Sequence, residues 1–195
     1  RVSPNSTIKS NEVWGSEIDT KRFETSLKLG YVFPELPFQS FGLQIAYSNH
    51  QQDSYFGVNV YDIKHESMYS NFLFNSIIGD TRSKFKTGIN FTHDSYNELI
   101  NTSNYNRKEN AIGAFFEYAF DNLEDFSLTA GIRIDRHNLL GTFITPRVHL
   151  RYVPWEKGVF RASAGRGKRS ANIFAENQQL FASSRKINID NIGGN

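Results

Sequence analysis

The chain has 195 residues, of which 38% are hydrophobic and 22% charged, and its formal net charge is only +2 at pH 7. This length suffices for one domain with a core, and the weak net charge argues against an electrostatic nucleic-acid binder. Cysteine is absent, which excludes disulfides, thiolate metal ligands and a cysteine nucleophile. The sequence lacks the roughly 18 consecutive apolar residues of a transmembrane helix and does not open with a signal-peptide pattern.

Apolar and polar residues alternate with a period of two along most of the chain, which predicts β-strands with one apolar and one polar face. In one such stretch, Leu128 and Ile132 alternate with Thr129 and Arg133. We predict strands, in chain order, at residues 20–33, 38–49, 64–78, 83–96, 109–120, 126–137, 143–153 and 158–166. All neighbouring strands should be antiparallel, and no long helix is expected among them.

Short turns alternate with longer polar stretches between these strands. The turns fall near residues 34, 80, 122 and 155, and the polar stretches cover residues 49–54, 97–110 and 137–141 and the chain after 166. We interpret the polar stretches as loops, of which 97–110 either contacts a ligand or is a disordered surface segment. An up-and-down sheet with short turns at one end and long loops at the other is typical of outer-membrane β-barrels.

The two ends of the chain differ from this regular pattern. Residues 1–18 are expected to form a loop that follows another strand. Residues 167–185 are expected to form a short helical turn over the barrel mouth, with Ile173, Leu180 and Phe181 on one face.

The polar face of the predicted sheet supplies the candidate site. In a barrel in lipid, the apolar face contacts acyl chains and the polar face lines the lumen. The candidate lumen-facing residues are Arg133, Asp135, Arg147, His149, Arg151 and Arg161. Glycines at 88, 113, 131 and 165 fall on the same face, where they would leave room for long charged side chains. The 17 Phe and 9 Tyr include several near strand ends, as in an interfacial aromatic girdle.

A set of short motifs occurs in the C-terminal part of the chain. Gly131, Arg133 and Asp135 form a G-x-R-x-D strand, and Pro146-Arg147 begin the next one; Gly165-Arg166-Gly167 end a third, followed by Arg169, Asn172 and Glu176. This combination resembles the barrel of TonB-dependent outer-membrane receptors, and the similarity extends over about residues 55–185.

The resemblance implies a segment of a receptor in the outer membrane of a Gram-negative bacterium. Such receptors take up a scarce ligand, such as a metal chelate or siderophore or cobalamin, with the help of the TonB complex. They have about 22 strands and a plug, so we expect residues 1–195 to be a barrel fragment of about eight strands that lacks the plug. The implied partners are membrane lipid, the rest of the barrel, its plug and, through the plug, TonB. The ligand cannot be identified from the sequence.

No catalytic or metal site is predicted. The five histidines show no metal-ligand spacing, and Gly165–Lys168 lacks a phosphate-loop pattern. Charged pairs such as Arg133 with Asp135, and Glu117 with a nearby arginine, are more typical of links between barrel strands than of acid–base catalysis. We therefore expect neither enzymatic activity nor a cofactor. Two alternatives stay open: a small complete barrel with a structural or adhesive role, and a soluble β-sandwich or carbohydrate-binding module, because both produce the same alternation.

Overall fold

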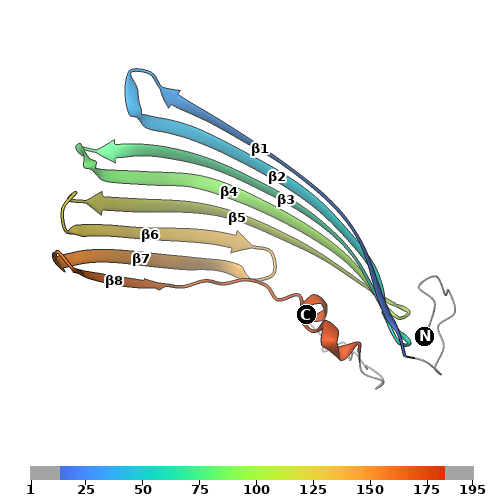
Figure 1. Cartoon of the computed structure of the whole chain (residues 1–195). Helices are drawn as coiled ribbons and strands as arrows, with labels where there is room; N and C mark the ends of the chain where they lie inside the picture. Colours follow the sequence, from blue (N-terminus) through green and yellow to red (C-terminus); the bar gives the residue numbers. More distant parts are fainter. Residues whose placement is uncertain (1–13, 183–195) are drawn as a thin grey trace.

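The computed structural model describes residues 14–182. These residues form one curved antiparallel sheet, in which strands follow each other in chain order (Figure 1). The elements are β1 (Ser16–Phe33), β2 (Leu36–Phe56), β3 (Asn59–Ile78), β4 (Asp80–Ile100), β5 (Ser103–Asp121), β6 (Phe126–His137), β7 (Gly141–Trp155), β8 (Gly158–Gly165), the one-turn helix α1 (Ile173–Glu176) and the 3-10 turn η1 (Gln178–Leu180). The sheet is open, with β1 at one edge and β8 at the other.

The predicted topology is confirmed. All eight predicted strands are present, every neighbouring pair is antiparallel, and the described part of residues 83–166 contains no helix. Within residues 14–182, no helix has the length and apolar character that crossing a membrane requires.

Two of the predicted loops are wrong. Residues 49–54 continue β2, and residues 97–110 belong to β4 and β5, so the turns between strands are confined to 57–58 and 101–102. Gly57 and Asn101 accommodate these tight turns with φ angles of 62° and 53°. The prediction failed because the apolar residues change faces in this region. The face that carries the apolar band becomes polar, as in the pairing of Asn97 with Asn106, whereas Tyr96 and Ile100 lie on the opposite face and the backbone ladder continues.

The start of the chain is also ordered earlier than predicted. Residues 16–18, which were expected to belong to a loop, pair with the end of β2 as part of β1. The rest of the predicted N-terminal loop, up to residue 13, lies outside the described residues.

Register pairing defines two faces of the sheet. One face has an apolar band that runs across all strands and includes Leu29, Phe41, Phe72, Ile89, Ile112, Ile132, Val148 and Phe160. Near the short turns, rings of this band contact one another in a row, with centroid distances of 4.9 Å between Phe41 and Phe74 and 5.8 Å between Phe74 and Phe85. The opposite face is the polar face.

The apolar band ends at one level in β1 to β5. The last row is Thr25, Tyr47, Met68, His93 and Asn110, and two rows further the same face has Lys21, Gln51, Lys64, Asn97 and Asn106. We call the part of β1 to β5 beyond this boundary the polar extension. The sheet end with the turns at 57–58, 101–102 and 138–140 is called the loop end.

The buried apolar residues lie on the polar face at the loop end. Tyr61, Ile63, Ile100 and Phe181 form this core, and Phe56, Tyr96, Tyr105 and Phe174 pack around it. Phe174 and Phe181 belong to the segment after β8, residues 166–182, which we call the returning segment. It runs from the end of β8 to α1 and η1, and its contacts place it against the loop end of the sheet (Figure 1).

The helical turn expected in this region is confirmed, but its contacting face is predicted only in part. Phe181 is 3% exposed, whereas Ile173 and Leu180 are 66% and 55% exposed. The reason is the break between α1 and η1 at Asn177, whose backbone is not helical. A single helical face therefore does not extend over both elements, and Phe174 takes the contact expected of Ile173.

Candidate functional site

The six candidate residues share one face of the sheet. Across β6 and β7 the pairs are Arg133 with Thr145, Asp135 with Phe143, Gly131 with Arg147, Thr129 with His149 and Ser127 with Arg151, and across β7 and β8 Arg151 faces Arg161. Paired residues have the same facing because side chains alternate along each strand. By the same register, Leu128, Ile132, Val148, Leu150 and Phe160 lie on the opposite face.

Arg133 and Asp135 form a close ion pair along β6. The Arg133 Nε donates to both carboxylate oxygens of Asp135, at 2.9 and 2.7 Å, and Nη2 donates at 2.7 Å. Asp135 is only 5% exposed because it lies over Gly113, its partner on β5. A Cβ atom at Gly113 would overlap the Asp135 carboxylate and lie 2.7 Å from the Asn90 amide oxygen. The glycine therefore leaves the space that the buried carboxylate fills.

A second ion pair crosses a whole strand. Arg147 on β7 reaches over Gly131 on β6 to the carboxylate of Glu117 on β5. The glycine is needed here too, since a Cβ at Gly131 would lie 3.2 Å from the Arg147 Nε. Lys86 on β4 approaches the same carboxylate at 4.0 Å. The prediction that Glu117 links strands through an arginine is thus confirmed, and together these side chains border a recess of about 420 Å³.

The remaining candidates lie near the short-turn end. His149, Arg151 and Arg161 line a smaller recess of about 290 Å³ together with Ser127, Thr129 and Ser163. Arg151 and Arg161 face each other across β7 and β8. Within residues 14–182, neither forms an ion pair with an acidic side chain. Their exposed guanidinium groups give this end of the polar face a positive charge.

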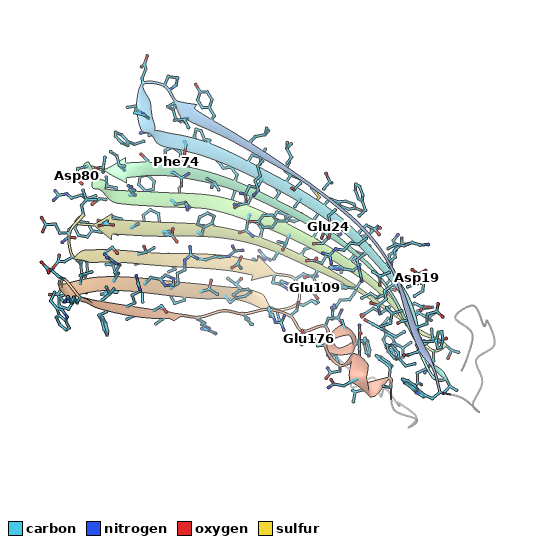
Figure 2. The ribbon with its side chains drawn as sticks, in the orientation of Figure 1. Asp19, Glu24, Phe74, Asp80, Glu109 and Glu176 are labelled. Atoms are coloured by element: carbon cyan, nitrogen blue, oxygen red, sulfur yellow. The ribbon has the colours of Figure 1, made fainter. Side chains whose placement is uncertain are left out.

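A group of carboxylates at the loop end, two of them buried, was not predicted from the sequence. Glu109, labelled in Figure 2, is 5% exposed and contacts Arg107 Nε at 2.8 Å, His137 Nε2 at 3.3 Å and the Ser170 hydroxyl. Nearby, His65 Nε2 lies 3.0 Å from Asp94 Oδ1. The available signal was the continued alternation of Tyr96, Glu98 and Ile100 within the stretch that was predicted to be a loop.

Glu98 is the most buried of these acids. It is 3% exposed and accepts a hydrogen bond of 2.8 Å from the Tyr61 hydroxyl. Burial raises the pKa of Tyr61 well above its ordinary value, and the bond to the Glu98 carboxylate raises this pKa further. Tyr61 is therefore a neutral hydrogen-bond donor whose ring is held in a fixed orientation.

The histidines do not gather into a ligand set. Each of the five lies on a different strand: His50 on β2, His65 on β3, His93 on β4, His137 on β6 and His149 on β7. In the part of the chain that the structure describes, no three side chains of the metal-binding types are close enough to hold an ion.

The motif residues of β7, β8 and the returning segment shape the start of that segment. The Pro146 carbonyl accepts a hydrogen bond of 3.0 Å from the Arg166 N–H, just where β8 ends at Gly165. The Asn172 side chain caps α1 by accepting from the Ala175 N–H at 3.1 Å. Arg169 Nη2 contacts Glu176 Oε1 at 3.0 Å. A Cβ at Gly167 would meet no atom within 4 Å, so nothing in the structure explains this glycine.

Comparisons with known proteins agree with this geometry. A sequence profile described as "TonB dependent receptor-like, beta-barrel" matches residues 3–195. The structure resembles the siderophore receptor PirA from Pseudomonas aeruginosa with a TM-score of 0.68 and 14% identity, over 82% of this chain and 28% of that one. It also resembles the alcaligin outer membrane receptor FauA from Bordetella pertussis with a TM-score of 0.58 and 13% identity, over 77% of this chain and 29% of that one.

These matches cover most of this chain but only part of each receptor. The chain spans less than a third of the length of either receptor. No curated protein matches the sequence. Since the family profile covers nearly the whole chain, the protein belongs to the TonB-dependent receptor-like β-barrel family.

Proposed function

We propose that residues 1–195 form part of the wall of a larger β-barrel in the outer membrane of a Gram-negative bacterium. The observation that supports this most is the apolar band, in which large side chains remain uncovered on every strand. Ile89, Ile132 and Phe160, for example, are 56%, 47% and 58% exposed. A continuous apolar surface of this kind requires lipid or another apolar partner, and in β1 to β5 the band gives way to polar residues at one level, as the apolar belt of a membrane barrel does.

Neither alternative function finds the same support. A soluble β-sandwich would cover the apolar face with a second sheet, but residues 14–182 form a single sheet. A small complete barrel would pair its first and last strands, but β1 and β8 lie at opposite edges here. We propose instead that further strands of the same receptor pair with both edges, and that a plug fills the lumen.

In this arrangement the polar face lines the lumen. Arg133, Asp135, Arg147, His149, Arg151 and Arg161 would then face the plug and the water inside the barrel. The Arg133–Asp135 and Arg147–Glu117 ion pairs would stiffen the wall. They fit without steric overlap because they lie over Gly113 and Gly131. We propose that the protein moves its ligand without converting it and without a cofactor, which is the role that membership of this receptor family supports.

We propose that the whole receptor takes up a scarce ligand, such as an iron chelate of the siderophore type, cobalamin or a similar compound, with energy from the TonB complex acting through the plug. Family membership supports this role. So do the similar structures, which are a siderophore receptor and an alcaligin receptor.

Uptake by whole cells tests the proposal. A strain that lacks the gene is compared with the complemented strain for uptake of radiolabelled ferric siderophores and of labelled cobalamin, each with and without a functional TonB. We expect one class of ligand to depend on both the gene and TonB. Equal uptake of every ligand in both strains, with the receptor present in outer-membrane fractions, would contradict a transport role.

A further inference from the structure

At the loop end, an aromatic ring of the returning segment fills a site made by the sheet. The ring of Phe181 lies nearly parallel to that of Tyr61, with the centroids 5.1 Å apart and an angle of 9° between the planes. Phe56 stacks on it at 6.5 Å and 22°. We call the surroundings of Phe181, formed by Phe56, Tyr61, Ile63 and Ile100, the ring site.

The ring site is rigid. Tyr61 is fully buried, and its hydroxyl is fixed by the carboxylate of Glu98. Ile63 and Ile100 extend from the paired strands β3 and β4, so their backbones are held by the sheet ladder. A preformed flat surface of this kind favours a planar ring over a puckered one, since stacking needs two flat faces.

The occupant, by contrast, belongs to a segment with little regular secondary structure. It sits at the end of a four-residue helix and a three-residue 3-10 turn, and elements this short have little stability of their own. Ile173 and Leu180 beside it face solvent. Phe181 is the residue of the returning segment that enters the ring site, and Phe174 packs against Tyr105 at 5.1 Å. The rest of the segment has its own contacts with the sheet, through Ser170 on Glu109 and Lys168 on the Leu140 carbonyl.

Hydrogen bonds beside the ring define a second requirement. Asn59 Nδ2 donates to the Phe181 carbonyl at 3.0 Å, and Arg107 Nη1 donates to the Ala171 carbonyl at 3.3 Å. Asn59, at the tip of the β2–β3 hairpin, thus presents a donor to an oxygen atom next to the bound ring, and Arg107 holds the segment before α1. A ligand that replaces the returning segment would match the Asn59 donor with an oxygen acceptor attached close to its own ring.

We propose that the ring site binds a flat aromatic group with an adjacent oxygen acceptor, and that Phe181 occupies the site when no such ligand is present. The proposal rests on the proposed function only in taking the aromatic group to be part of the transported ligand. Binding itself requires no uptake. Because Phe181 and the ligand compete, the apparent dissociation constant rises with the fraction of molecules in which Phe181 is in place.

Fluorine NMR on the full-length receptor in detergent tests the displacement. Phe181 is replaced with 4-fluorophenylalanine, and the probes are benzoate and cyclohexanecarboxylate, which share the carboxylate but differ in ring flatness. We expect benzoate to move the fluorine signal from a buried to a solvent-exposed position in a saturable way, and cyclohexanecarboxylate to leave it unchanged. A signal that benzoate does not move, or that both probes move equally, would overturn the proposal.

Three variants separate ligand binding from packing. Phe181→Ala removes the competitor and should tighten benzoate binding about tenfold if Phe181 occupies its site in about 90% of molecules. Leu180→Ala, a matched truncation of an exposed neighbour, should leave the affinity unchanged. Tyr61→Leu, which keeps apolar volume but removes the flat face, should abolish binding in the Phe181→Ala background. Failure of Phe181→Ala to bind benzoate more tightly than the native receptor would also overturn the proposal.

The outcome is independent of the transport assay. If uptake is lost in the gene deletion but benzoate never displaces Phe181, the transport function stands and the ring site is only a packing contact. If benzoate displaces Phe181 while no ligand is taken up, the ring site stands and the transport function fails.

Discussion

The apolar band and the polar extension are made of the same strands, yet different forces hold them. In the band, the sheet has no side-chain core, and its large apolar residues are exposed to the surroundings. In the extension, the buried apolar residues gather on the opposite face, around Tyr61 and Ile100. The backbone ladder crosses this boundary without interruption, as the continuous register of β3 with β4 shows. Side-chain periodicity therefore reports the environment of a strand and not its conformation.

The two halves of the sheet differ at the loop end as well. β2 to β4 have 20 or 21 residues each, whereas β6 has 12 and β8 only 8. The returning segment begins where β8 stops and contacts the extension of the longer strands, through the Ser170 hydroxyl on Glu109 and the Arg107 bond to Ala171. The segment that follows the short strand β8 thus covers part of the loop end of the longer strands.

A charge placed on each side of the boundary should give the largest contrast. Ile132→Arg puts an arginine in the apolar band, where lipid exposure should cost about 2–4 kcal/mol of folding free energy at mid-depth. Asn106→Arg puts the same side chain on the same face of the polar extension, where the cost should be about 0–1 kcal/mol. Denaturant titration of the receptor in lipid vesicles measures both. Equal effects of the two substitutions would show that the band does not contact lipid.

Replacing a glycine of the polar face with alanine should destabilise the receptor only where another side chain lies over that glycine. Gly113→Ala forces a methyl group against the Asp135 carboxylate and the Asn90 amide, and overpacking of this kind costs about 1–3 kcal/mol. Gly30→Ala on β1 is the control, since a Cβ there meets only the Phe41 carbonyl at 3.8 Å. We expect the same titration to show a loss only for Gly113→Ala. A similar loss for Gly30→Ala would mean that the overlap with Asp135 and Asn90 is not responsible, since alanine is otherwise favoured over glycine in a strand.

This contrast also shows what could be predicted from the sequence. The order of the strands and their two faces follow from alternation in the band, where Leu128 and Ile132 oppose Thr129 and Arg133. The extension was not predicted, because the apolar period of the band stops at Asn97 and Asn106 and the apolar residues of the extension, such as Ile100, lie on the opposite face. The sequence shows that Phe181 is apolar but not which residues it contacts, since those contacts join residues more than 100 positions apart. The alternation of neighbouring residues is enough to predict a strand. The contacts between the returning segment and the sheet depend instead on how the whole sheet curves.

Within the polar extension, removal of one hydroxyl tests the role of the buried acid. Tyr61→Phe leaves the ring in place but deprives the buried Glu98 carboxylate of its donor, which should cost about 1–3 kcal/mol. Tyr105→Phe, a half-buried tyrosine of the same region, is the matched control and should cost less. Calorimetry of the receptor measures both. If Tyr61→Phe is neutral, Glu98 is satisfied by another donor and the rigidity of the ring site needs a different source.

The smallest effect is expected at the opposite end of the sheet, in the turn between β3 and β4. Asp80, labelled in Figure 2, accepts hydrogen bonds of 2.9 Å from both the backbone N–H and the Nε of Arg82. The Arg82 side chain, followed by its N–H, lowers the pKa of the Asp80 carboxyl below its usual range. A lowered pKa means that the stabilisation is complete above the pKa of the unfolded chain, about 3.9, and disappears as the pH falls through the folded value.

Amide hydrogen exchange at Arg82 provides the measurement, after correction for the intrinsic pH dependence of exchange. Protection of this N–H should decrease below about pH 4, while loss of this one pair should change the stability of the whole receptor little, since both side chains are exposed to water. In Asp80→Asn the protection should be lower at neutral pH and should no longer vary with acidification. Glu156→Gln, in the exposed turn between β7 and β8, should leave the Arg82 profile unchanged. Acid-sensitive protection that survives in Asp80→Asn would place the titrating group elsewhere in the sheet.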